Sequence, residues 1–192
     1  MYAVAAFTIA IISQRSLFVW FGSLLSFLAL IQVMRFGHLF TFDLPSYLMT
    51  YRPMQLAFLT HAMLMMVIAG VIQRGGPERQ KLFGKPLFFS SLLTSAITLA
   101  LVIPMVSVAQ GSMLWGRILL IAIIWLVWAY LQEQDWLFSL SQLTFAGGLF
   151  VGVLAFLSSY SWFTDVSDPL LHPWTIQAQL FAVGLSSIGW AL

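Results

Sequence analysis

Long apolar runs alternate with short polar stretches along the whole chain. The inner runs are each close to the roughly 20 residues that a membrane-spanning helix needs. The pattern therefore predicts an all-α protein, a polytopic transmembrane helical bundle of about six to seven spans, of which the terminal ones are partial. We expect these spans at residues 1–13 (partial), 17–34, 54–73, 87–109, 113–131, 136–160 and 175–192 (partial).

The two ends of the chain differ from the inner runs. Residues 1–13 are too short to span a bilayer, and as a signal peptide they would lack a basic start and a small-residue cleavage site. We therefore prefer the tail of a longer helix. The last run reaches Leu192 with no polar flank. The prediction is a single transmembrane domain, 1–192, that is a fragment of a longer polytopic protein.

The most polar stretch is the predicted loop Arg74–Pro86, which holds four of the eight basic residues. With Arg15 it places five basic residues on one side of the membrane, against three on the other side (Arg35, Arg52 and Arg117). Basic residues concentrate in cytoplasmic loops. We therefore predict a multi-pass protein of the bacterial inner (plasma) membrane with loop 74–86 in the cytoplasm.

Composition supports the membrane class and excludes several others. The chain is 61% apolar and 7% charged, whereas soluble domains have about 25% charged residues. Its basic residues are dispersed at segment ends, so we predict membrane lipid and no nucleic acid as a partner. There is no cysteine, no H-E-x-x-H spacing and no nucleotide-binding glycine motif. We predict no metal and no cofactor.

Small residues mark two possible contact faces and a repeat. Gly148 and Gly152 form a G-x-x-x-G spacing, which favours close helix packing but is also common by chance. Gly22 and Ser23 begin a second small-residue face. The segments LFFSSLLTSA and LFSLSQLTFA agree at six of ten positions, fifty residues apart. They indicate either tandem helical hairpins or a coincidence of composition.

Three candidate binding residues lie in or beside the earlier spans. His61 falls within a span, where an ionisable group is a functional candidate; the alternative is a neutral histidine that hydrogen-bonds a neighbouring helix. Arg35 and Arg52 bracket the first outward loop, 36–53. They either anchor helix ends in the headgroups or bind an anion such as a pyrophosphate.

The second outward loop, 161–174, carries another candidate group. Asp165 or Asp168 near His172 would suit a carboxylate that orients a general base. Asp-Pro and His-Pro pairs are equally good turn formers, so a structural role stays open. No acidic residue falls within a predicted span, which argues against an ion-coupled pump in this part of the chain.

The sequence from AIIWLVWAYLQEQDW through SSYSWF, followed by DPLLHPWTIQAQLFAVGLSSIGW, resembles the middle of bacterial O-antigen ligases and polymerases. The shared features are Trp-rich span ends, a glutamine early in a helix and a Pro-Trp entry into the next span. The resemblance implies a glycosyltransferase-type enzyme that transfers a lipid-linked glycan at the outer face. It implies catalytic roles for His172 and Arg52, with Arg35, His61 and Asp168 as substrate-binding candidates. The alternative is a non-enzymatic membrane scaffold or a portion of a transporter.

Overall fold

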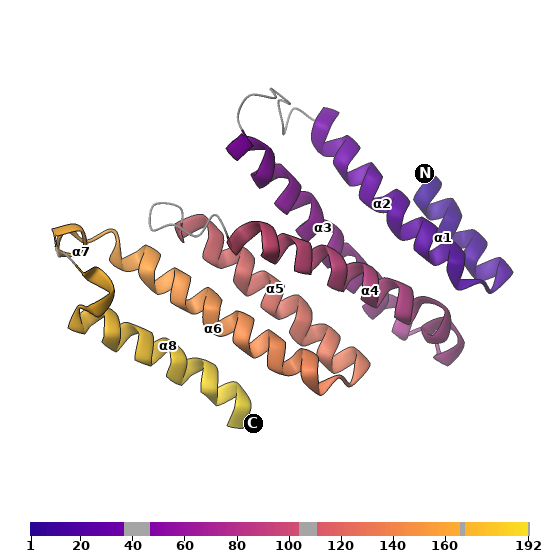
Figure 1. Cartoon of the computed structure of the whole chain (residues 1–192). Helices are drawn as coiled ribbons and strands as arrows, with labels where there is room; N and C mark the ends of the chain where they lie inside the picture. Colours follow the sequence, from indigo (N-terminus) through magenta and orange to yellow (C-terminus); the bar gives the residue numbers. More distant parts are fainter. Residues whose placement is uncertain (37–46, 104–110, 166–167, 192) are drawn as a thin grey trace. The chain divides into compact units, whose positions relative to one another are not determined.

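The structure is a computed structural model that describes residues 1–36, 47–103, 111–165 and 168–191 (Figure 1). All regular secondary structure in these ranges is helical, which confirms the all-α fold class. The described chain forms two compact units, Met1–Leu101 and Val102–Leu192. Residues 37–46 of the predicted outward loop and residues 104–109 of the predicted span 87–109 lie outside the described residues.

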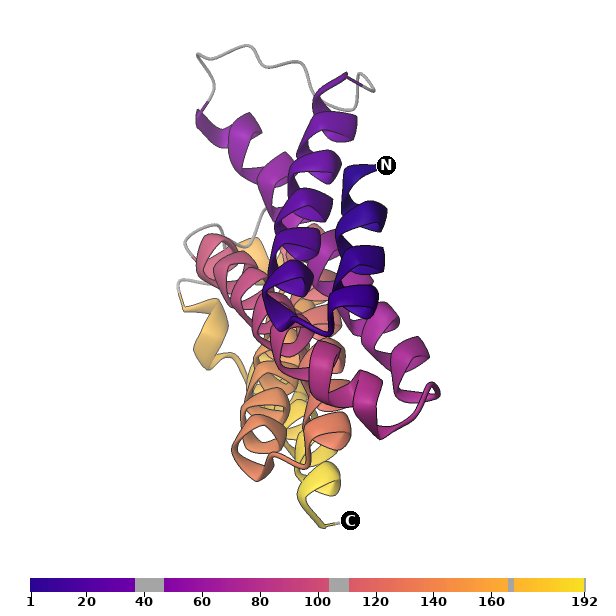
Figure 2. The same cartoon turned by 90° about the vertical axis from the view of Figure 1, so that its right-hand side faces the viewer.

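The first unit contains four helices. Helix α1 packs along α2, and α2 packs along α3 (Figures 1 and 2). The turn between α1 and α2 and the turn between α3 and α4 lie at the same end of this unit in both views. The helices are α1 (Tyr2–Ser13), α2 (Ser16–Phe36), α3 (Tyr47–Gln73) and α4 (Pro77–Val102).

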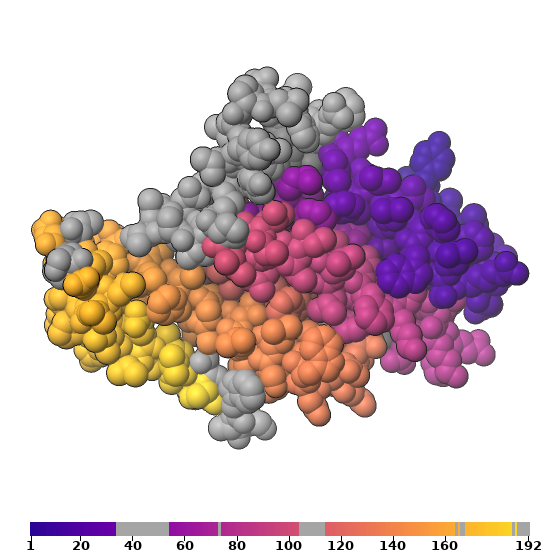
Figure 3. Space-filling view, in the orientation of Figure 1, coloured from indigo at the N-terminus to yellow at the C-terminus, as the bar shows by residue number. Residues whose placement is uncertain are grey.

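The second unit is an antiparallel helical hairpin with a third long helix beside it. Helices α5 and α6 form the hairpin, and α8 packs along α6, as the orange and yellow surfaces in Figure 3 show. Two short helices connect α6 to α8. The elements are α5 (Gly111–Gln132), α6 (Asp135–Leu157), α7 (Ser161–Asp165), η2 (Pro169–Leu171) and α8 (Pro173–Ala191).

Five helices in the described part of the chain are long and apolar enough to cross a membrane. Their exposed surfaces carry large apolar side chains, such as Leu24 and Leu28 on α2 and Leu143 on α6. Lipid is the solvent that such surfaces suit. The chain is therefore a multi-pass integral membrane protein. The candidate spans are Ser16–Val33, Met54–Ile72, Pro77–Val102, Leu114–Gln132 and Asp135–Leu157.

The predicted loop 74–86 is mostly helical, which corrects the sequence interpretation. Helix α4 begins at Pro77 and continues through Pro86, leaving three residues as the turn. Proline suits a helix start, and Glu78 in the first turn complements the helix dipole. At 26 residues, α4 is about 39 Å long. It exceeds the roughly 30 Å hydrocarbon core, so the helix is long enough for its charged first turns to lie outside that core, among the headgroups.

Two helical hairpins share the same tight turn. Residue Gln14 between α1 and α2 has φ 54°, and Glu133 between α5 and α6 has φ 52°. In both hairpins a helix ends, a left-handed residue follows, and the next helix begins after one further residue. The turn between α3 and α4 is one residue longer and places its left-handed residue last, at Gly76 with φ 97°. The α1–α2 and α5–α6 turns are therefore of one kind, and the α3–α4 turn is of another.

Glycines allow close helix contacts inside each unit. A Cβ atom at Gly22 would lie 2.6 Å from the Phe7 ring of α1. A Cβ at Gly148 would lie 2.7 Å from Leu119 Cδ2 of α5, and one at Gly152 would lie 3.4 Å from the Trp115 ring. These contacts confirm the helix-contact role predicted for the G-x-x-x-G spacing of α6.

Candidate functional site

The predicted site residues divide between the two units. Arg35 lies in the last turn of α2 and Arg52 in the first turns of α3. The structure describes only the helical backbone at these two positions. His61 lies further along α3. Asp168 and His172 flank η2 in the second unit. The structure thus brings Asp168 and His172 into one connection, beside a pocket.

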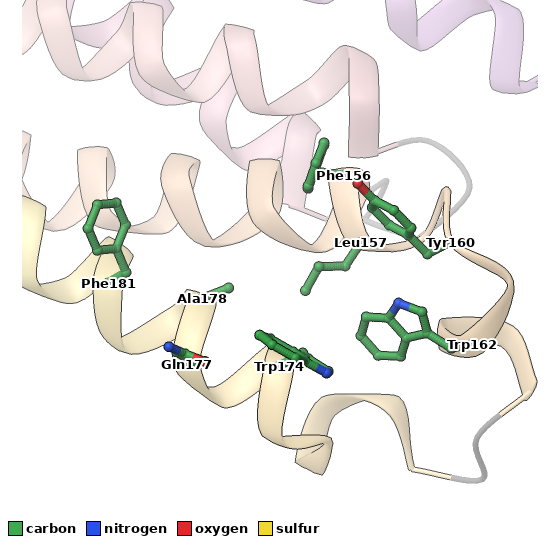
Figure 4. A pocket seen from close by; sticks show the side chains of 8 residues that line it. All are labelled: Phe156, Leu157, Tyr160, Trp162, Trp174, Gln177, Ala178 and Phe181. Atoms are coloured by element: carbon green, nitrogen blue, oxygen red, sulfur yellow. The ribbon is translucent and has the colours of Figure 1, made fainter.

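An aromatic pocket of about 460 Å³ opens between the end of α6, α7 and the first turns of α8 (Figure 4). It lies at the end of α6 opposite the α5–α6 turn. Leu157 projects from α6 toward α8, and the rings of Trp162 and Trp174 border the same space. The lining residues are Phe156, Leu157, Tyr160, Trp162, Trp174, Gln177, Ala178 and Phe181.

Local hydrogen bonds hold this end of the second unit in shape. The Ser158 main-chain N–H donates to the Leu154 carbonyl at 2.9 Å, which closes α6. The Thr175 hydroxyl donates to the Pro169 carbonyl at 2.7 Å, and this bond joins η2 to α8. Pro173 is the first residue of α8, a position where its missing N–H costs nothing. These hydrogen bonds therefore stabilise the α6–α8 connection, which forms part of the pocket wall.

His172 contacts the pocket wall through Trp162. The two ring centroids are 4.4 Å apart, with an interplanar angle of 32°. Its Nδ1 accepts a hydrogen bond from the Trp174 main-chain N–H at 3.4 Å. Neutral His172 therefore carries its proton on Nε2 and can donate it to a ligand. This arrangement makes Nε2 a hydrogen-bond donor rather than a base.

Asp168 contributes through its main chain in the described structure. Its carbonyl accepts the Leu171 N–H at 3.1 Å, and the residue is exposed. Among the described residues, no hydrogen bond or ion pair joins its carboxylate to the His172 ring. The carboxylate–histidine pairing expected from the sequence stays a prediction.

A second site is a buried polar cluster between α2, α3 and α4. His61 is 1% exposed. Its Nε2 lies 3.0 Å from the Ser23 carbonyl and 3.3 Å from the Ser23 hydroxyl, which also contacts the Ser90 hydroxyl. Its Nδ1 lies 3.4 Å from Thr94 Oγ1. Because a carbonyl only accepts hydrogen bonds, Nε2 carries a proton.

The hydroxyl groups of this cluster belong to a buried polar face of α4 that the sequence interpretation missed. The Ser91 hydroxyl donates to the Ala62 carbonyl of α3 at 2.8 Å. The Thr94 hydroxyl bonds the Ser90 carbonyl at 2.9 Å. The sequence signal for this face is the spacing of its serines and threonines, which follow Ser90 by one, four, five and eight positions and so fall on one side of a helix. The buried members are Ser90, Ser91, Thr94, Ser95 and Thr98.

The Gln55 side chain caps the C-terminal end of α4. Its side-chain amide donates to the Leu101 carbonyl at 3.0 Å, and Gln55 is fully buried. Leu101 lies in the last turn of α4, where carbonyls have no partner within the helix. The side chain from α3 therefore caps α4 inside the apolar interior.

Metal binding has no support from the geometry of the described residues. No cluster of three or more histidine, aspartate or glutamate side chains that could hold an ion occurs among them. Comparisons of the chain with protein families, curated proteins and solved structures found no match. The fold defines the class, which is a multi-pass integral membrane protein. It has an aromatic pocket at the end of one span and a buried polar cluster around one histidine, His61.

Proposed function

We propose that the protein binds a lipid-linked glycan at the aromatic pocket and acts as a glycan ligase or polymerase at the outer face of a bacterial inner membrane. The observation that carries the proposal is the pocket beside His172. Its volume of about 460 Å³ falls within the roughly 300–1,000 Å³ of small-molecule sites. Its lining is aromatic with few polar groups, as ligand sites commonly are.

The position of the pocket suits an amphipathic ligand. It follows the apolar span Asp135–Leu157 directly, at the depth where tyrosine and tryptophan concentrate in membrane proteins. Phe156 and Phe181 provide apolar surface for an isoprenoid chain. The Tyr160 hydroxyl and the Gln177 amide provide polar groups for a sugar or phosphate. A lipid-linked glycan combines both kinds of surface in one molecule.

The proposed chemistry assigns His172 to stabilising the leaving group. With Nδ1 accepting from the Trp174 main chain, the Nε2–H of neutral His172 can donate a hydrogen bond to the leaving pyrophosphate oxygen, where negative charge develops. The sequence resemblance assigns anion binding through bidentate guanidinium bonds to Arg52 and Arg35 of the first unit, and the pocket proposal does not depend on them. Asp168 would bind the glycan. These four roles rest on the sequence resemblance and on residue chemistry.

The proposed orientation rests on the exposed basic residues at one end of the first unit. Arg15 lies in the α1–α2 turn, and Arg74, Arg79 and Lys81 lie at the α3–α4 turn. This end would face the cytoplasm by the positive-inside rule. Three spans separate it in sequence from the α6–α8 connection. The aromatic pocket would then face outward.

A binding measurement on the intact protein in nanodiscs tests the proposal. The probe is an undecaprenyl-pyrophosphate-linked oligosaccharide, and the variants are Trp174→Ala and Trp136→Ala. Both tryptophans are exposed in the second unit, but Trp136 lies at the far end of α6. We expect Trp174→Ala to raise Kd about tenfold, equivalent to about 1.4 kcal/mol. Trp136→Ala should leave Kd unchanged.

The same preparation separates an enzyme from a scaffold. His172→Phe should lower the rate of glycan transfer to an acceptor by roughly 100-fold while Kd for the donor stays within about twofold, since the lost hydrogen bond acts on the leaving group in the transition state. Equal effects of the two tryptophan substitutions would overturn the pocket assignment. Donor binding without transfer by the natural chain would favour the alternative, a membrane scaffold or transporter portion.

A further inference from the structure

The buried cluster around His61 has more hydrogen-bonding capacity than one protonation state uses. Its two ring nitrogens each face an oxygen, the Ser23 carbonyl at 3.0 Å and Thr94 Oγ1 at 3.4 Å. The Thr94 hydroxyl has one proton and three acceptors in reach, which are His61 Nδ1, the Ser90 carbonyl at 2.9 Å and the Ser91 carbonyl at 3.3 Å. The direction of this one hydroxyl decides what Nδ1 can do.

We propose that His61 is a proton-binding site within the membrane, where Thr94 reorients as the proton arrives. In the neutral state the Thr94 hydroxyl donates to Nδ1, while Nε2–H donates to the Ser23 carbonyl. A hydrated proton then gives its proton to Nδ1 and releases water, and the new Nδ1–H donates to Thr94 Oγ1. The hydroxyl turns to donate to the Ser90 carbonyl. No heavy atom has to move between the two states.

Both states keep every polar group of the cluster paired. The Ser90 carbonyl lies inside α4 and has the helical N–H four residues on as a further donor, so it tolerates loss of the hydroxyl. Buried polar groups without partners cost about 1–3 kcal/mol each. A site that pairs its groups in both states therefore avoids this cost at either charge.

The surroundings of His61 contain no second ionisable group to compete for the proton. Residues 54–72 of α3, 16–33 of α2 and 87–102 of α4 have His61 as their single titratable side chain. The His61 ring also lies 5.4 Å from the Phe27 ring, at 71°. Phe27 is therefore an apolar wall of the cluster. Ser23, Phe27 and Thr94 thus form the environment of the charged state.

This inference does not depend on the proposed glycan function, because the cluster and the aromatic pocket belong to different units. The group that takes up and releases the proton is His61, which lies among helices α2, α3 and α4. Helices α2, α3 and α4 are joined through this cluster, so its charge state affects their contact.

Nitrogen NMR of histidine-labelled protein in lipid bilayers tests the proposal directly. The chain has three histidines, so His38→Gln with His172→Gln leaves His61 as the single labelled ring. At high pH we expect one protonated and one bare ring nitrogen. Acidification should convert these to two protonated nitrogens while the helical circular dichroism is unchanged. A spectrum that stays neutral at every pH at which the protein remains folded would overturn the proposal.

Thr94→Val and Thr98→Val form a matched pair for the role of the hydroxyl. Both threonines are buried on the same face of α4, but Thr98 bonds the Thr94 carbonyl and leaves His61 untouched. Thr94→Val should move the conversion to lower pH by about one unit, because a charged donor loses more than a neutral acceptor. Thr98→Val should not move it. Equal shifts in the two variants would show that Thr94 takes no part in proton binding.

Discussion

Leu119 of α5 occupies the space above Gly148 of α6. Its Cδ2 lies 2.7 Å from the position where any other residue at 148 would place its Cβ, and Ile118 Cγ2 lies at 3.3 Å. Membrane helices have little hydrophobic driving force between them, so close van der Waals packing stabilises their association. The missing side chain at 148 is therefore a determinant of the α5–α6 hairpin.

Gly148→Leu should destabilise this hairpin. A leucine side chain at this position has to displace Leu119, and overpacking costs about 1–3 kcal/mol. The measurement is thermal or denaturant unfolding in detergent micelles, followed by helical circular dichroism.

Gly147→Leu is the matched control, since Gly147 is exposed and a Cβ there meets nothing within 4 Å. It should leave the stability unchanged or raise it slightly, because leucine is a better helix former than glycine. Equal losses in both variants would contradict the close contact at Gly148.

Glu133→Gly should stabilise the protein. Glu133 has φ 52° and is exposed, and a left-handed conformation costs a residue with a side chain about 1–2 kcal/mol. Glycine avoids this cost, so we expect a gain of roughly 1 kcal/mol in the free energy of unfolding.

Gln132→Gly provides the contrast, because Gln132 is the last residue of α5 and lies before the left-handed position. Glycine within a helix lowers stability by up to about 1 kcal/mol. A loss of stability in both variants would show that the turn does not depend on the left-handed residue.

Gln55→Leu should lower stability by leaving the Leu101 carbonyl without its side-chain donor. The hydrogen bond is 3.0 Å long and Gln55 is fully buried, so the expected cost is about 1–3 kcal/mol. Gln32→Leu on the exposed surface of α2 is the control and should be neutral. Unchanged melting of the Gln55 variant would show that Leu101 finds another donor.

Cysteine labelling tests the membrane topology on a chain with no natural cysteine. Arg74→Cys lies in the α3–α4 turn and Asp168→Cys lies in the α6–α8 connection, and both positions are exposed. Three candidate spans separate them, so a membrane-impermeant maleimide should reach one from each side. Labelling of both positions from the same side would contradict the assignment of the spans.

Sequence reasoning failed most clearly at residues 77–86. The charges of this segment indicated a loop, because apolarity was the criterion for a span. Helix formation depends on backbone hydrogen bonds rather than on apolarity, and Pro77 and Glu78 are favourable at a helix start. Pro86, read as the end of the loop, lies inside the helix. The helix therefore continues past the apolar region into the polar surroundings.

Individual side chains of the candidate sites could be recognised in advance to different degrees. His61 stood out because an ionisable residue within an apolar run is rare, and hydrogen bonds to neighbouring helices were one of its two expected roles. Its partners were not predictable. Ser23 and Thr94 are 38 and 33 positions away in sequence, and serine and threonine occur in many spans.

The amino-acid sequence alone determined the class of this protein and most of its helices, because apolar runs of spanning length have one stable arrangement in lipid. It also identified the α6 glycines as a packing face. Only the tertiary structure decided which faces meet. In a membrane, lipid-facing and interior surfaces are both apolar, so hydrophobic periodicity does not distinguish them. The cluster of His61 with Ser23 and Thr94, and the pocket around Trp162 and Trp174, follow from that choice of faces.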